Sequence, residues 1–393
     1  MPPPPAPSPH TRRAIVWLAW IVAVLVIHGS LYPWRFALPA SLPQAWHHMM
    51  HQPSLWTTLG DVVGNVVLFV PVGMLGWALV HRWIGWRRTL VVLAVGVAFA
   101  FVLQVAQLFV PRRDAALSDV LWNALGLLIG MGLVAGGSRV HLPWLGRESL
   151  RAPLAMVTLW LMLQWWPMVP RLDWQQIKDS LKPLLLRPQW STFSAIETAL
   201  GLMVVGLMVR GLRRRGALVL ALVVVAALGK LLTMHQALTL SRVVGWVAGL
   251  VGVWLLWRLP PRAAAWSVVA AAWLWFTADE LRPFEFSTEL GEFHWLPFAA
   301  LLQGSLVANT SALAWHLFWL GTVMLLANAQ GARAAPLAVG LSVWALLLEL
   351  FQTLLPARVA DSTPLLLPWV WLLALPVLHP QPTYPGKPIA QPV

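Results

Sequence analysis

The chain lacks cysteine and contains very few charged residues. None of its 393 residues is cysteine, which excludes disulfides, thiolate catalysis and cysteine-ligated zinc. Only 10% of the residues are charged, whereas a soluble domain carries roughly 25%. A chain with so little charge cannot cover its own surface for water, so its composition excludes an ordinary soluble protein.

Apolar residues make up 59% of the chain and form long runs. Lipid permits only helices or closed barrels, because every backbone polar group needs a partner. A barrel strand would alternate apolar and polar residues over about 10 positions, and runs such as 14–27 and 90–103 do not alternate. The sequence therefore predicts an all-α fold, a polytopic transmembrane helical bundle with about twelve spans. The expected spans are 14–31, 57–80, 89–110, 117–136, 152–169, 193–210, 216–234, 239–257, 263–278, 311–329, 335–355 and 363–378.

The formal net charge of +13 is distributed unevenly between the expected loops. With the N-terminus inside the cell, the inner loops hold 16 basic residues and one acid, Glu148, and the outer side holds 11 basic residues and 13 acids. Such a bias in short loops sets the orientation of a membrane protein. We therefore expect both termini in the cytoplasm, and we interpret the charge as a topology signal rather than as a surface for nucleic acid.

The sequence repeats itself in units of four expected helices. Residues 31–36, LYPWRF, match residues 281–286, LRPFEF, and segment 104–113 matches 349–358 through a Gln followed six residues later by an Arg. A fainter middle copy is indicated by Leu240, Ser241, Arg242 and Gly249, which parallel Leu117, Ser118, Asp119 and Gly126 in order and spacing. We predict a disordered cytoplasmic tail, a first, a middle and a last transmembrane unit, and a second cytoplasmic tail. Their bounds are 1–13, 14–136, 137–262, 263–378 and 379–393.

Three outer connections are long or polar. Segment 34–56 contains prolines, and 167–190 is expected to form an amphipathic helix on the outer membrane surface. Segment 277–293 carries five acids and one Arg, so we expect solvent around it. His47 and His51 would share a helix face, but no carboxylate accompanies them. The sequence therefore predicts no metal and no cofactor.

Polar residues of the first unit gather toward one membrane surface. Asp61 and Asn65 are four residues apart and so share a helix face. An ionised carboxylate at mid-membrane costs roughly 3 kcal/mol, so Asp61 needs a partner, and Arg113 or Arg112 is the natural one. The sequence predicts a polar pocket at the outer leaflet. Its expected members are Asp61, Asn65, Gln104, Gln107, Arg113, Asp119 and Asn123.

The span expected at 117–136 carries a stripe of polar and small residues. Asp119, Asn123, Gly126 and Gly130 follow one face of this helix. The two glycines, four residues apart, allow another helix to approach closely.

These motifs together resemble the VanZ-like family. The resemblance covers roughly residues 28–132 and rests on positions that agree in order and spacing. Those positions are Leu31, Tyr32, Pro33, Asp61, Asn65, Phe69, Pro71, Gly73, Gln107, Arg113, Asp119, Asn123 and Gly126. The last unit, roughly 275–378, resembles the pattern more weakly. It does so through 281–286 and through Glu349, Gln352, Arg358 and Asp361, which complete the candidate site.

One position departs from the family pattern. The family usually has Glu three residues before the glutamine; this chain has Gln104 there, whereas the last unit keeps Glu349. The departure counts against an acid–base role for the first unit.

The resemblance implies a multi-pass protein of the bacterial cytoplasmic (inner) membrane. The family is named for a protein associated with low-level resistance to teicoplanin, a glycopeptide antibiotic, and its biochemical activity is undefined. Four interpretations stay open: polar glue between helices, binding of an anionic lipid or lipid-linked envelope precursor, an enzyme with Glu349 or Asp119 as acid or base, and a transporter. The expected partners are membrane lipids and a lipid-linked glycan or glycopeptide, without nucleic acid.

Overall fold

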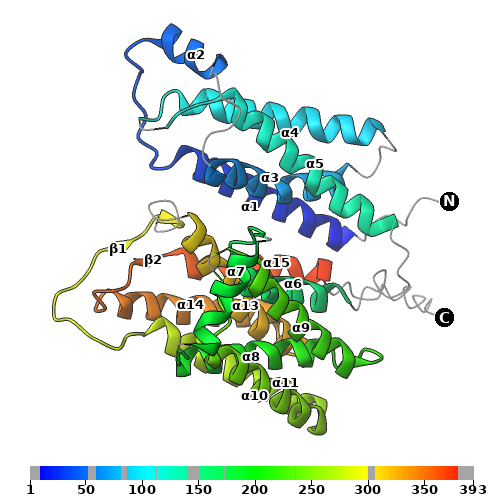
Figure 1. Ribbon diagram of the computed structural model, residues 1–393. Coiled ribbons are helices and arrows are strands. Elements are labelled where there is room, and N and C mark those ends of the chain that lie inside the picture. The colour runs from blue at the N-terminus through cyan, green and yellow to red at the C-terminus, as the bar shows by residue number, and fades with distance from the viewer. Residues whose placement is uncertain are drawn as a thin grey trace, which may run out of the picture. The chain divides into compact units, whose positions relative to one another are not determined.

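In the part of the chain that the computed structural model describes, the regular structure is helical apart from one pair of two-residue strands (Figure 1). It describes residues 9–51, 59–80, 86–111, 113–139, 150–171, 173–186, 188–234, 236–299 and 306–378. The first expected tail lies outside the described residues up to position 8, and the second lies outside them from 379 onward; a helix already begins at Pro9. The chain divides into two compact units, Met1–Glu148 with Leu373–Val393, and Ser149–Leu372.

The first compact unit contains five helices within its described residues. They are α1 (Pro9–Leu31), α2 (Leu42–Met50), α3 (Leu59–Leu79), α4 (Trp86–Gln107) and α5 (Leu117–Arg139). Helix α2 was not expected: it lies in the connection 34–56, and the Ser41 hydroxyl accepts a hydrogen bond from Gln44 N at its start.

Helices α3 and α5 approach closely because glycines line their contact. A Cβ atom placed at Gly130 would lie 2.1 Å from the Val70 carbonyl oxygen, and one at Gly126 would lie 2.3 Å from that of Val66. No larger residue fits at either position, as the expected small-residue stripe requires. A buried apolar cluster that includes Val26, Phe69 and Leu127 fills the space between these helices, α1 and α4.

The second compact unit begins with another five helices. They are α6 (Arg151–Trp165), α7 (Trp174–Leu185), α8 (Thr192–Met208), α9 (Arg215–Leu232) and α10 (Leu240–Arg258). Gly245 of α10 lies against the Ala195 carbonyl of α8, so this pair packs through glycine as α3 and α5 do.

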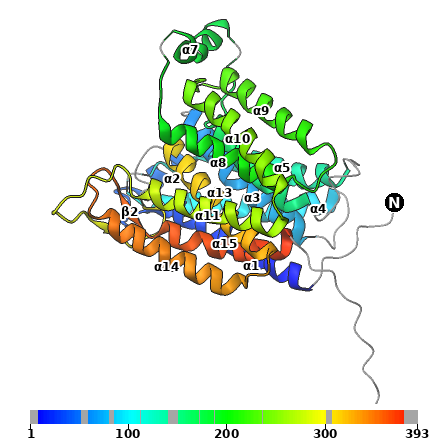
Figure 2. The same ribbon diagram turned by 90° about the horizontal axis from the view of Figure 1, so that it is seen from below.

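Helix α7 is the helix expected in segment 167–190, and it lies at the margin of its unit (Figure 2). Its N-terminus is capped by Asp173, which accepts a hydrogen bond from Gln176 N at 2.6 Å. That bond, with the neighbouring Arg171, lowers the pKa of the Asp173 carboxyl. Gln176 also donates to the Thr233 carbonyl at 3.0 Å, which ties α7 to the end of α9. Its position on a membrane surface stays a prediction.

The remaining elements belong to the second unit, except that α15 continues past its end at Leu372. They are α11 (Pro261–Glu280), β1 (Phe293–His294), α13 (Leu306–Ala329), α14 (Ala334–Gln352), β2 (Ala360–Asp361) and α15 (Thr363–Leu378). Strands β1 and β2 pair in parallel, Phe293 opposite Ala360. They join the connection after α11 to the connection before α15.

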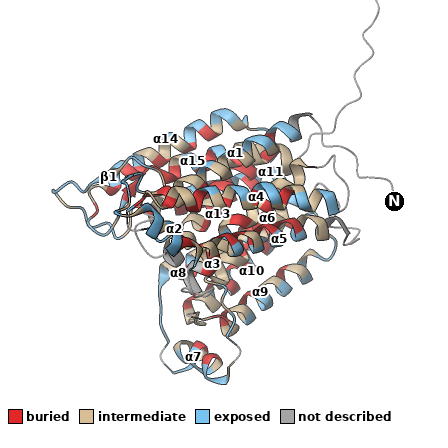
Figure 3. Ribbon diagram, turned by 90° about the horizontal axis from the view of Figure 1, so that it is seen from above, coloured by how far each residue is buried: buried red, intermediate tan, exposed pale blue. Residues whose placement is uncertain are grey.

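Many helical residues are exposed (Figure 3), and large apolar side chains are among them. Trp20, Val95 and Val247 are between 58% and 67% exposed on their helices, as is typical of helices that face lipid. A helix covers each of the twelve expected spans. Among the described residues, seven helices are long and apolar enough to cross a membrane, and three shorter apolar segments accompany them. The chain is thus a multi-pass membrane protein, and the count of twelve spans stays a prediction.

Candidate functional site

Helices α1, α6 and α11 each lead into the same kind of turn around a proline. In each turn, the residue after the proline has a left-handed φ near +60°. The backbone N–H of this same residue donates to the carbonyl three residues earlier. The three bonds are Trp34 N to Leu31 O at 2.8 Å, Met168 N to Trp165 O at 2.7 Å, and Phe284 N to Leu281 O at 2.9 Å.

The first turn is held by side chains from the region between α4 and α5. Arg113 donates from Nη2 to the Gly29 carbonyl at 3.0 Å and from Nε to the Tyr32 carbonyl at 3.4 Å. Gln107 donates to the Ser30 carbonyl at 3.0 Å. The last carbonyls of a helix lack partners within it and carry partial negative charge. Arg113 therefore caps α1, and partial burial lowers the pKa of Arg113 from its usual value.

The last turn is held in the same way. Arg358 donates from Nε to the Arg282 carbonyl at 2.9 Å and from Nη2 to the Asp279 carbonyl, and this nitrogen lies 3.8 Å from the Asp279 carboxylate. Gln352 donates to the Glu280 carboxylate. Arg358 thus takes the position in the last unit that Arg113 takes in the first.

In the middle segment, Lys230 stands in the position of Gln107 and Gln352, and Gln236 stands in the position of Arg113 and Arg358. The two residues are again six apart. Lys230 is fully buried and donates from Nζ to the Gln164 carbonyl at 2.7 Å and to Gln236 Oε1 at 3.1 Å. Gln236 donates to the Trp166 carbonyl. At the end of α6, the Lys230 ammonium group therefore takes the place of the Gln107 amide, and the Gln236 amide takes the place of the Arg113 guanidinium.

Other residues of the expected pocket meet beside the first turn. Gln104 is buried, donates to the Asp119 carboxylate at 3.2 Å and accepts a hydrogen bond from Ala116 N at 3.0 Å. Asn123 is buried one turn further along α5, and its Oδ1 has no hydrogen-bond partner among the described residues. Asn65 lies on α3 and is half-buried.

The expected ion pair of Asp61 lies outside the described residues. The side chain of Asp61 and the whole of Arg112 are not described. The contacts of Arg113 that the structure does show are to backbone carbonyls. These contacts make Arg113 a capping residue and do not direct its guanidinium toward a ligand.

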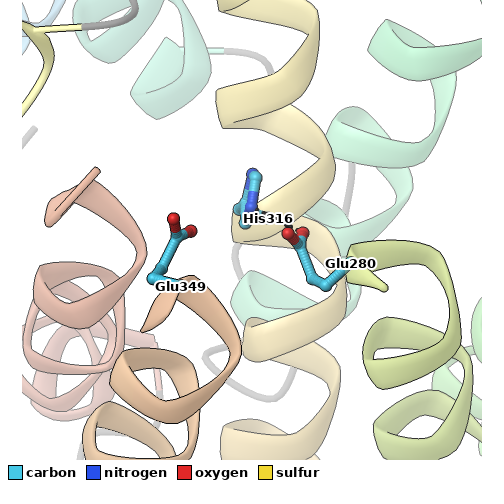
Figure 4. A group of neighbouring side chains, drawn as sticks. All are labelled: Glu280, His316 and Glu349. Atoms are coloured by element: carbon cyan, nitrogen blue, oxygen red, sulfur yellow. Dashed lines mark ion pairs between the residues drawn. The ribbon is translucent and has the colours of Figure 1, made fainter. Parts of the chain in front are cut away.

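The last unit brings together three ionisable side chains from three helices (Figure 4). Glu280 ends α11, His316 lies in the middle of α13, and Glu349 lies near the end of α14. Glu280 Oε1 is 2.8 Å from His316 Nε2. One potential ligand atom from each of the three residues lies within 4.8 Å of the other two.

The burial of Glu280 corrects one expectation from the sequence. Segment 277–293 was expected to be solvated as a whole, but Glu280 is 3% exposed. The reason is its position: it forms the last turn of α11, where α13 and α14 cover it. The later acids Glu285, Glu289 and Glu292 are exposed as expected.

A second polar centre lies between α6, α8, α10 and α13. A partly open cavity of about 190 Å³ is lined there by Gln164, Ser194, Glu197, Thr198, Arg242 and Ser311. Trp160, Trp315 and Trp319 form its aromatic walls. Trp315 Nε1 donates to Glu197 Oε1 at 2.6 Å, and Arg242 Nη1 donates to Gln236 Oε1 at 3.3 Å.

Several of these residues were not among the site residues predicted from the sequence. Glu197, Lys230 and His316 each stand within an apolar run that was expected to span the membrane. An ionisable residue inside such a run is by default a candidate functional residue, and this signal could have identified all three.

The fold and the buried polar centres define a multi-pass helical membrane protein with ionisable groups inside its bundle. Residues 15–137 match the family model described as VanZ/LLP1. This part of the chain is therefore a VanZ-like unit, as expected from its motifs. No curated protein and no solved structure matches the chain.

Proposed function

We propose that this protein binds the anionic headgroup of a lipid-linked envelope precursor within its helical bundle, in the cavity around Arg242. The observation that carries the proposal is the cavity itself. It places a half-buried arginine, five other polar side chains and three tryptophans around one space inside an apolar bundle. Polar groups at such depth are expensive, and a ligand that uses them would explain why they converge.

The size of the cavity limits what enters it. Its volume of about 190 Å³ is below the range of about 300–1,000 Å³ that is usual for drug-sized ligands. The cavity therefore accommodates part of a headgroup, such as a phosphate or a single sugar ring. The hydrocarbon tail of the ligand would remain in the bilayer.

The lining selects a sugar phosphate over a bare phosphate. The planar guanidinium of Arg242 matches two phosphate oxygens at once. Glu197 would repel a second anion, but its carboxylate accepts hydrogen bonds from sugar hydroxyls. The tryptophan walls offer flat apolar faces to a sugar ring. An arginine and a carboxylate in one cavity thus fit a ligand with one anionic end and one hydroxylated end.

This proposal moves ligand binding away from Arg113 and Arg358. Those two guanidiniums donate to helix-terminal carbonyls, which would be left without partners if a ligand took the donors. Arg242 donates to a glutamine side chain instead, and that contact is readily exchanged for a stronger charge-assisted bond.

We also propose where the chain is located and how its segments are organised. We infer twelve spans in the bacterial cytoplasmic membrane, with both termini inside and the three proline turns at the outer surface. We also infer that the three segments are copies of one unit. The recurring turn, the capping donors that follow it and the glycine-mediated helix pairs support that inference.

The test measures binding of defined lipids to the purified full chain in detergent. The probes are a polyprenyl diphosphate-linked monosaccharide, polyprenyl phosphate and uncharged polyprenol, followed by native mass spectrometry. We expect the charged, sugar-bearing probe to bind most tightly and Arg242→Gln to weaken it at least tenfold. Ser311→Phe, which fills the cavity, should have a similar effect.

Arg333→Gln is the matched control. Arg333 belongs to the same compact unit, is exposed at the start of α14 and does not line the cavity. This variant should bind the probe as the parent does. Equal binding by the parent and by both cavity variants would refute the proposal.

An effect on glycopeptide susceptibility follows if the bound ligand is the envelope precursor that the antibiotic recognises. We expect expression of the parent chain in a teicoplanin-sensitive host to raise the inhibitory concentration of teicoplanin, and Arg242→Gln to abolish that increase. The same inhibitory concentration with and without the parent chain would remove this part of the proposal.

A further inference from the structure

We propose that Glu280, His316 and Glu349 form a binding site for one divalent transition-metal ion, of the kind represented by Zn²⁺ or Mn²⁺. The ligand set is one imidazole nitrogen and two carboxylates, which these ions accept. The three side chains come from α11, α13 and α14 and point toward one another (Figure 4). The proposal is independent of the Arg242 cavity.

The imidazole of His316 is oriented as a metal ligand requires. Its Nδ1 lies 2.7 Å from the Ala312 carbonyl, one helical turn earlier. A carbonyl can only accept, so Nδ1 carries a proton. Without a metal, Nε2 also carries a proton and pairs with Glu280 Oε1 at 2.8 Å; a metal ion would replace that proton and take the Nε2 lone pair. Most metal-binding histidines are fixed in this way, by a hydrogen bond from the other ring nitrogen to a carbonyl or carboxylate.

Each carboxylate is also fixed through one oxygen. Gln352 donates to Glu280 Oε2, and Asp361 N donates to Glu349 Oε2 at 2.9 Å. Oε1 of Glu280 faces His316. All three ligands therefore have an outer partner that holds them in place, an arrangement that metal sites use to tune affinity.

The charge of the cluster favours a bound cation. Two carboxylates, each at most 4% exposed, share this site with a single imidazole. Like charges a few ångströms apart in a poorly polarisable interior repel strongly. A divalent ion between the two carboxylates offsets that repulsion.

The first unit lacks this site, although its backbone is arranged in the same way. Gln104 there accepts a hydrogen bond from Ala116 N, as Glu349 accepts one from Asp361 N. Ser30 precedes its turn where Glu280 precedes the last turn. Because neither Gln104 nor Ser30 supplies a carboxylate, we expect one ion per chain, in the last unit.

The test uses the purified full chain after treatment with a chelator and dialysis. It is titrated separately with Zn²⁺, Mn²⁺ and Co²⁺, and bound metal is counted by plasma mass spectrometry. We expect one equivalent per chain and a higher melting temperature in its presence. Bound Co²⁺ should show visible absorption bands, and bound Mn²⁺ should show magnetic coupling to an imidazole nitrogen.

Two variants test the ligands separately. His316→Gln and Glu349→Gln should each weaken metal binding at least tenfold. Glu349→Gln keeps the acceptor for Asp361 N, and a glutamine already occupies the corresponding position in the first unit, so this variant should fold. His47→Gln is the control for the stacked pair His47 and His51, whose rings lie 4.2 Å apart, and should bind metal as the parent does.

The outcomes decide between a metal site and a metal-free ion pair. The proposal fails if the parent binds none of the three ions stoichiometrically, or if Glu349→Gln leaves the affinity unchanged. Loss of binding in His47→Gln would assign the metal to His47 and His51 at the end of α2 and would overturn the proposal as well. Loss of lipid binding in Arg242→Gln with metal binding intact would show that the two sites are separate.

Discussion

Arg113 and Arg358 make the same pair of backbone contacts at the ends of two different helices. Arg113 donates to the carbonyls of Gly29 and Tyr32, and Arg358 donates to those of Asp279 and Arg282. In each case the second carbonyl belongs to the residue before the proline of the turn. A proline cannot donate, and a helix end leaves its carbonyls without partners, so the arginine supplies donors that the backbone lacks.

We therefore predict that Arg358→Ala destabilises the protein. Hydrogen bonds from a charged donor contribute about 1.5–3 kcal/mol each, and the carbonyls of α11 would lose their donor. The measurement is the melting temperature of the purified protein in detergent. Arg333→Ala is the control, because Arg333 is exposed at the start of α14 in the same unit. Equal stability of the two variants would show that the cap contributes nothing.

Lys230 offers a second test of capping, because the other two units show which residue can replace this lysine. Glutamine stands in the corresponding position of the first and last units, at Gln107 and Gln352. We predict that Lys230→Gln retains folding, since its amide can donate to the Gln164 carbonyl. Lys230→Met leaves that buried carbonyl unsatisfied and should cost about 1–3 kcal/mol.

Thermal unfolding of both Lys230 variants, monitored by circular dichroism, checks this prediction. If Lys230→Met were as stable as the parent, relief from burying the ammonium would outweigh the lost hydrogen bonds. Capping of α6 would then not be the role of this lysine.

Close packing of α3 and α5 depends on Gly130. Its Cβ would meet the Val70 carbonyl at 2.1 Å, and the backbone of a helix cannot yield locally. Gly130→Ala should therefore separate the two helices and cost about 1–3 kcal/mol, as overpacking generally does. Gly132→Ala is matched to it: it lies two residues further along α5, and its Cβ would meet nothing within 4 Å. Only the first substitution should lower the melting temperature.

The absence of cysteine makes the predicted orientation directly testable. A single Cys in place of Glu289 should react with a membrane-impermeant maleimide in intact spheroplasts, because that residue is exposed in a connection predicted outside. A single Cys in place of Arg213 should react only after permeabilisation. The reverse pattern of labelling would invert the orientation of the whole chain.

Much of the fold was readable from the sequence. The apolar runs predicted the helices because long stretches without charge can satisfy their backbone groups in lipid only as helices. The glycine stripe of α5 predicted a close helix contact, and the motifs of the first unit identified a VanZ-like segment. The match between the first and last units included Arg113 and Arg358, and these two arginines make equivalent backbone contacts.

The sequence alone determined that the twelve apolar runs are helical and too apolar for water, and which polar positions recur, but it did not predict helix α2. Only the tertiary structure decided what the polar side chains touch, because their partners lie far away in the chain. The donors of Arg113 reach carbonyls about eighty residues earlier, and Glu280, His316 and Glu349 meet although each pair is more than thirty residues apart. Periodicity places a residue on one helix face, whereas the packing of separate helices determines which faces converge.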